Sequence, residues 1–143
     1  MSYFDLEVLI WPATAIFLVT LVVSYRLTRW PEVSIVVALI KAGIFLTYFG
    51  LVFDGTYTFL DDWRYLEGGR KLLTHDVGIT NLADHWQQVR GISGGDHLVY
   101  YLYNAYAFRF FGDGYFAPVA CNILLTVAVA YCGAKLATTE FQT

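Results

Sequence analysis

Long apolar runs alternate with short polar segments along this chain of 143 residues. A helix needs about 20 consecutive apolar residues to cross the hydrocarbon core of a bilayer. We therefore predict an all-α, polytopic integral membrane protein in which residues 1–143 form a single membrane domain with about four transmembrane helices. The expected spans are residues 8–25, 33–53, 97–112 and 117–137. The third is short and aromatic, so we expect it to be tilted or partly interfacial.

Residues 54–96 separate the second and third runs and contain most of the acidic residues. We expect this segment to be a water-facing loop that carries short interfacial helices. Apolar residues recur in it at helical spacing, which predicts a helix lying on the membrane surface with Trp63 as an anchor. The residues of this expected apolar face are Leu60, Trp63, Leu66 and Leu73.

The composition supports a membrane protein and excludes other classes. The chain is 57% hydrophobic, 18% aromatic and only 15% charged, with a mean hydropathy of +0.52, values that argue against a soluble globule. The net charge is −3 and no basic stripe with interleaved aromatics is present, so nucleic acid is excluded as a partner. Cys121 and Cys132 lie in one apolar run, and we interpret them as packing residues.

Basic residues in short loops favour the cytoplasmic side of a membrane. Arg26 and Arg29 lie in the turn between the first two runs, and Arg109 marks the turn at 109–116. Both turns are then cytoplasmic, and the two turns indicate the same orientation of the chain. We therefore expect the N-terminus and the 54–96 loop to be extracytoplasmic, on the outer face of the cytoplasmic membrane or its equivalent.

The adjacent carboxylates Asp61 and Asp62 lie at the start of the predicted surface helix. One interpretation is that an aspartate caps free backbone N–H groups, where the helix dipole also favours negative charge. The other is that one of the pair is a general base facing a substrate at the membrane surface. Spacing alone favours capping.

Other polar residues have simpler interpretations. Lys41 lies inside the second run at a depth of roughly 10 Å, where snorkelling or pairing with another helix is favoured over catalysis. We interpret Gly68–Gly69 and Gly94–Gly95 as turns and helix ends. Three acid–histidine neighbours match no ligand spacing typical of metals, so a solvated loop is favoured. A divalent ion stays open as an alternative if Asp61 and Asp62 join them. The neighbours are His75 with Asp76, Asp84 with His85, and Asp96 with His97.

The order of these features carries a resemblance. Along the chain come Asp61 and Asp62, Tyr65, Leu72 and Leu73, then His97, Tyr100 and Tyr101, then Phe111, Gly112 and Asp113. Over roughly residues 34–138 this order resembles the N-terminal region of GT-C fold glycosyltransferases, which use polyprenyl-phosphate-linked sugars as donors. The protein O-mannosyltransferase and aminoarabinose-transferase group is the most similar. The chain departs from that pattern in having Asp62 where Glu is common, no proline after His97, and an extra first span. Such enzymes have many more membrane helices, so this chain would correspond to their front portion.

The resemblance implies roles for the candidate residues. Asp61 would be the general base that deprotonates an acceptor hydroxyl, and Asp62 a helper or a metal ligand. Arg64, Arg70 and Lys71 would bind the donor phosphate, with His97 and Tyr100 also in contact with substrate. The partners implied are the lipid-linked sugar donor, membrane lipids and further transmembrane helices or a membrane partner, and the one cofactor left open is the divalent metal ion.

The alternative from another class is a small non-catalytic membrane subunit. Such a chain would pack against a larger membrane partner through its aromatic and small residues.

Overall fold

The structure, a computed structural model, describes residues 3–56, 62–93 and 97–140. All regular secondary structure in these ranges is helical, which confirms the all-α prediction. The chain divides into two compact units, which we describe separately. Unit 1 comprises Met1–Asp54 with Val119–Thr143, and unit 2 comprises Gly55–Pro118.

Unit 1 contains the long apolar helices. They are α1 (Leu6–Thr28), α2 (Pro31–Thr47), which continues into the π-helical turn η1 (Tyr48–Val52), and most of α6 (Phe116–Glu140). Three helices of the described chain are long and apolar enough to cross a membrane: α1, α2 with η1, and α6. They coincide with three of the four predicted spans and extend beyond the expected boundaries, except that the second ends at Val52, one residue before the expected end.

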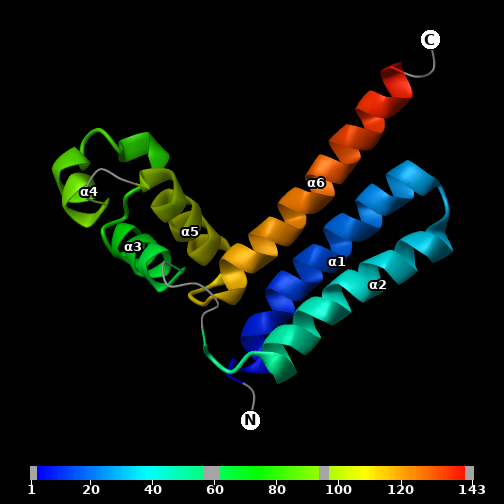
Figure 1. Cartoon of the computed structure of the whole chain (residues 1–143), viewed down its shortest axis with the longest axis horizontal. Helices are drawn as coiled ribbons and strands as arrows, with labels where there is room; N and C mark the ends of the chain where they lie inside the picture. Colours follow the sequence, from blue (N-terminus) through cyan, green and yellow to red (C-terminus); the bar gives the residue numbers. More distant parts are fainter. Residues whose placement is uncertain (1–2, 57–61, 94–96, 141–143) are drawn as a thin grey trace. The chain divides into compact units, whose positions relative to one another are not determined.

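Helices α1 and α2 pack against each other as an antiparallel hairpin (Figure 1), as the short link between the first two apolar runs indicates. Only Arg29 and Trp30 separate them, and Arg29 adopts the left-handed conformation (φ 61°), with its N–H donating to the carbonyl oxygen of Tyr25 at 2.9 Å. Ser34 fixes the other side of the turn, since its hydroxyl donates to the carbonyl oxygen of Trp30 at 2.7 Å. Each helix buries a stripe of small and apolar side chains: Leu9, Ala13 and Ile16 on α1, and Ala38, Ala42 and Phe45 on α2.

Unit 2 is built from shorter helices. They are α3 (Asp62–Thr74), the 3-10 turn η2 (Ile79–Asn81), α4 (Trp86–Ser93) and α5 (Leu98–Phe111). Their shared core contains Leu72, Val77, Val89, Tyr101, Leu102 and Ala105. Helix α5 corresponds to the expected span at 97–112 but has only 14 residues, about 21 Å at the usual rise. It is not one of the three helices long enough to cross a membrane, so a fourth span stays a prediction.

The glycine pair of α3 corrects the sequence interpretation. Gly68 and Gly69 lie inside α3 rather than in a turn or at a helix end. A Cβ atom on Gly68 would lie 2.6 Å from the ring of Tyr101, and one on Gly69 would lie 2.7 Å from Cβ of Asn104. The absence of side chains at these two positions is therefore what allows α3 and α5 to pack so closely. Gly94 and Gly95 lie outside the described residues.

The packing of α3 also differs from the expected apolar face. Leu66 and Leu72 are buried, and Leu73 is half-buried, but Trp63 is 53% exposed. The face in contact with α5 runs through Tyr65, Gly69 and Leu72 instead, and a pattern of large apolar residues misses it because glycine occupies its centre. Leu60 lies outside the described residues.

Two ion pairs contradict the prediction that the turn at 109–116 lies on the opposite side of the membrane from the 54–96 loop. Arg109 pairs with Asp76, and Arg70 pairs with Asp113 at 2.7 Å. The positive-inside rule predicts a cytoplasmic turn for Arg109 and Asp113 and an outer loop for Arg70 and Asp76. Residues in direct ionic contact lie on the same side of a membrane. Arg109 therefore cannot mark the side opposite to the loop, and only the α1–α2 turn still indicates an orientation.

Candidate functional site

An aromatic cluster joins the beginnings of α3 and α5. The ring of Tyr65, in the first turn of α3, lies 5.4 Å from the imidazole of His97 and 5.4 Å from the ring of Tyr100, centroid to centroid. Tyr101 lies 5.9 Å from Tyr65 on the core side and is buried, whereas Tyr100 is 59% exposed. The structure thus brings two predicted substrate-binding residues, His97 and Tyr100, together with Tyr65 at one surface. We call these three residues the aromatic cluster.

His97 owes its position to an unusual backbone conformation. It lies directly before α5 with φ 58°, the left-handed region that side chains other than glycine rarely adopt. Its carbonyl oxygen nonetheless begins the helix, because it accepts the backbone N–H groups of Tyr100 at 2.9 Å and Tyr101 at 3.2 Å. The imidazole is exposed and lies at an angle of 73° to the ring of Tyr65.

The two helices pair in the same chain direction. Tyr65 meets His97 and Tyr100, Gly69 meets Asn104, and Arg70 lies over the ring of Phe108. The N-terminal ends of α3 and α5 therefore lie at the same end of the pair. Unsatisfied N–H groups and the helix dipole make each such end favourable for negative charge.

Asp62, three positions before Tyr65, is the first described residue of α3. Asp61 and the side chain of Asp62 lie outside the described part of the structure. The choice between capping and catalysis therefore stays a prediction for both.

The three predicted phosphate-binding cations have different surroundings. Arg70 donates through Nε to both carboxylate oxygens of Asp113, at 2.7 and 2.9 Å, and its guanidinium carbon lies 5.7 Å from the ring centre of Phe108. This arrangement ties the end of α5 to α3. Arg64 is exposed and makes no ion pair within the described ranges. Of the three, Arg64 is therefore the one best placed to bind an external anion.

Lys71 pairs with Glu67 on the outer face of α3, at 2.7 Å from Nζ to the carboxylate. The hydrogen bond and the charge of Lys71 lower the pKa of Glu67 below its ordinary value of 4.5. Glu67 consequently stays ionised at neutral pH and neutralises Lys71, one helical turn away.

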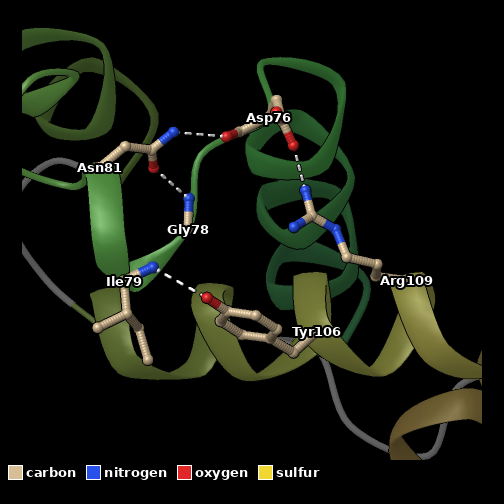
Figure 2. Close-up of polar contacts among 6 residues, drawn as sticks. All are labelled: Asp76, Gly78, Ile79, Asn81, Tyr106 and Arg109. Atoms are coloured by element: carbon tan, nitrogen blue, oxygen red, sulfur yellow. Dashed lines mark hydrogen bonds and ion pairs between the residues drawn. The ribbon is translucent and has the colours of Figure 1, made fainter.

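A polar network holds the segment between α3 and α4 against α5 (Figure 2). The side chain of Asn81 accepts the N–H of Gly78 at 2.7 Å and donates to the carbonyl oxygen of Asp76 at 2.9 Å. The hydroxyl of Tyr106 accepts the N–H of Ile79 at 3.0 Å. The carboxylate of Asp76 accepts from Arg109. The network fixes the segment that follows α3, and thereby the register between the two helices that carry the aromatic cluster.

Sequence reasoning missed this network and the partner of Arg70. The sequence pattern includes Asp113 only in the Phe111–Gly112–Asp113 order and indicates no role for Asn81 or Tyr106. Asn81 is the last residue of η2 and lies three positions after Gly78. Asn near Gly is typical of turns closed by a side-chain hydrogen bond, so the sequence has a local signal for this contact. The contacts Arg70–Asp113 and Ile79–Tyr106 join residues more than twenty positions apart and leave no local signal.

The acid–histidine neighbours do not assemble within the described residues. No group of three or more His, Cys, Asp or Glu side chains that could hold a metal ion occurs in residues 3–56, 62–93 and 97–140. Asp61 and Asp96 lie outside these ranges, so a divalent ion bound by the acidic pair is neither placed nor tested.

No protein-family model, curated protein or solved structure matches this chain.

Proposed function

We propose that this chain forms the N-terminal part of a membrane glycosyltransferase, which transfers a sugar from a polyprenyl-phosphate-linked donor to an acceptor at the extracytoplasmic membrane surface. The observation that supports this proposal most is the convergence of residues from two distant segments. Tyr65, His97 and Tyr100 lie together at the end of the α3–α5 pair where Asp61 and Asp62 occur in the sequence.

The site has the chemical groups that such a transfer uses. The acceptor oxygen forms a bond to the anomeric carbon, the bond from that carbon to the phosphate oxygen breaks, and polyprenyl phosphate leaves with the electron pair. Asp61 takes the proton of the acceptor hydroxyl. The exposed ring of Tyr100 offers an apolar face with a polar edge to a sugar. The N-terminal ends of α3 and α5, with Arg64, favour the phosphate.

We further propose a topology of three spans, with all of unit 2 on one side of the membrane. The ion pairs Arg70–Asp113 and Arg109–Asp76 support it, because they join the C-terminal end of α5 to residues of the segment that precedes α5. The short turn between α1 and α2 carries Arg26 and Arg29 and is assigned to the cytoplasm. Unit 2 and the N-terminus are then extracytoplasmic, and α6 returns to the cytoplasmic side.

An exposed apolar stripe on α5 fits a position in the bilayer interface. Val99, Tyr106 and Phe110 are all exposed and recur at spacings of seven and four residues, which puts them on one helical face. Arg109 borders this stripe. Apolar and aromatic side chains flanked by a cation are typical of helices that lie in the plane of the headgroups. The aromatic cluster would then face donors that diffuse within the membrane.

The experiment is sugar transfer by the protein as it occurs in its membrane, with a polyprenyl-phosphate-linked sugar as donor. Asp61→Asn is expected to abolish transfer without loss of membrane insertion or helix content. Asp84→Asn, an exposed carboxylate elsewhere in unit 2, is the matched control and is expected to transfer normally. Normal transfer by Asp61→Asn would refute the base assignment, and loss of folded protein would instead support the capping role.

The small-subunit alternative gives a different result in the same assay. Under that alternative, neither Asp61→Asn nor Tyr100→Ala changes transfer catalysed by a partner, as long as the chain still assembles with it. Loss of transfer in an assembled Asp61→Asn complex would exclude the alternative.

A further inference from the structure

Lys41 lies at the middle of a membrane-spanning helix. The span runs from Pro31 to Val52, 22 residues in all, and Lys41 follows its first residue by ten positions and precedes its last by eleven. At about 1.5 Å per residue, its Cα lies about 15 Å from either end of the span. The residue is deeper than the sequence predicted, because the helix begins at Pro31 and not at Val33.

The lysine stem is too short to bring the ammonium group to the headgroups. A fully extended stem reaches roughly 6 Å, and in a helix it points toward the N-terminus. The ammonium would still lie about 9 Å inside the first residue of α2 at that extension. A charge at such depth is costly unless it has a partner.

The described chain offers no such partner. Lys41 makes no ion pair or hydrogen bond with any residue in the described ranges. The acidic residues of the spans lie at helix ends: Glu7 and Glu32 are in the first turns of α1 and α2, and Glu140 is the last residue of α6. None lies within the chain at the depth of Lys41.

A groove on the same helix can receive another helix. It has a volume of about 440 Å³ and is lined by Ile40, Gly43, Ile44, Thr47, Tyr48 and Val52. A Cβ atom on Gly43 would meet nothing within 4 Å, so the surface is open there. Lys41 lies three residues before Ile44 and seven before Tyr48, on one helical face with both. It therefore borders the groove at mid-depth.

We propose that this face of α2 binds a further transmembrane helix that carries an Asp or Glu side chain at the middle of the bilayer. The carboxylate pairs with the ammonium of Lys41, and the small side chain of Gly43 lets the backbone of the incoming helix approach closely. Lipid phosphate does not fit this role, because it lies at the ends of the span, about 15 Å from the Cα of Lys41. The proposal holds for further helices of an enzyme and for a separate membrane partner alike, so it does not depend on the proposed function.

The test uses the full chain with Cys121→Ala and a donor dye on Cys132, which is exposed, in uncharged phosphatidylcholine vesicles. Synthetic transmembrane peptides of leucine and alanine, with an acceptor dye and either Asp or Leu at the central position, are titrated by energy transfer. The Asp peptide is expected to bind about tenfold more tightly than the Leu peptide.

Variants identify the residue responsible. Lys41→Gln is expected to bind both peptides equally, and Lys41→Asp is expected to prefer a peptide with a central Lys. Lys135→Gln is the matched control, because this lysine lies near the end of α6 and stacks on Tyr131 at 5.9 Å, and it should keep the preference for Asp. Equal binding of the Asp and Leu peptides to the unmodified chain would overturn the proposal. So would a preference for Asp that survives in Lys41→Gln.

Discussion

Replacing Gly69 by alanine tests whether the close contact between α3 and α5 holds unit 2 together. The new Cβ would lie 2.7 Å from Cβ of Asn104 and 3.1 Å from the backbone nitrogen of Ala105. Because one of these neighbours is backbone, relief requires the two helices to separate. Because a backbone atom cannot move aside alone, we expect a cost at the upper end of the usual range for overpacking, about 3 kcal/mol.

The same substitution also has a favourable term. Alanine stabilises a helix interior by about 1 kcal/mol relative to glycine. The expected net result for Gly69→Ala is a loss of about 2 kcal/mol in the stability of unit 2. That value corresponds to about a 30-fold increase in the exchange of the most protected amide hydrogens of α3 and α5, if these exchange through opening of the unit.

Amide hydrogen exchange followed by mass spectrometry in detergent micelles measures this difference. The matched control is Gly91→Ala in α4, where a Cβ would meet nothing within 4 Å. Because no steric contact opposes the higher helix propensity of alanine there, amide exchange should be unchanged or slower. Gly68→Ala should resemble Gly69→Ala, because its Cβ would meet the buried ring of Tyr101. Equal or slower exchange in Gly69→Ala than in the unmodified chain would refute the close contact.

Three further predictions concern single contacts in unit 2. Tyr106→Phe removes the acceptor for the N–H of Ile79 and should cost about 1 kcal/mol, visible as faster exchange of that amide. A double-mutant cycle of Arg70→Gln with Asp113→Asn should give a coupling of about 0.5 to 1 kcal/mol in thermal unfolding, because these side chains are 42% and 54% exposed; zero coupling would contradict the ion pair. Lys71→Gln should raise the pKa of Glu67 toward 4.5, measured by carboxyl titration in nuclear magnetic resonance. Since the pair lowers this pKa, its stabilisation is present above pH 4.5 and is lost as the pH falls through the lowered pKa.

The three long apolar helices were predictable because their central turns have mostly apolar side chains. Their boundaries were less so. Helix α1 continues through Arg26 to Thr28, since charged side chains are tolerated at the headgroup level. Helix α2 starts at Pro31, a residue favoured in the first turn of a helix, and this signal was not used.

The fold of unit 2 was harder to predict because its determinants are tertiary. Gly68 and Gly69 have the local signature of a helix break, and only their fit against Tyr101 and Asn104 explains them. The positive-inside rule misplaced Arg109 because it counts charges without their partners, and here the partner is Asp76. Ion pairs between residues so far apart in sequence leave no local pattern.

The candidate site was predictable in part. The order of residues singled out His97 and Tyr100, and both contact Tyr65 in the structure. The order of residues did not show which of the three basic residues is open to a substrate phosphate. Arg70 and Lys71 are already paired with Asp113 and Glu67. The roles of Asp61 and Asp62 remain predictions for the transfer assay to decide.

The most direct test of the account is the sidedness of unit 2. Single cysteines are placed at Thr80, Asp113 and Trp30 in a chain with Cys121→Ala and Cys132→Ala, and are labelled with a membrane-impermeant maleimide in right-side-out and inverted vesicles. Thr80 lies in η2, before α4 and α5, Asp113 follows α5, and Trp30 lies in the α1–α2 turn. The account predicts that cysteines at Thr80 and Asp113 label from the same side and the one at Trp30 from the other. Labelling of the cysteine at Asp113 from the side of Trp30 would show that α5 crosses the membrane and would contradict the account.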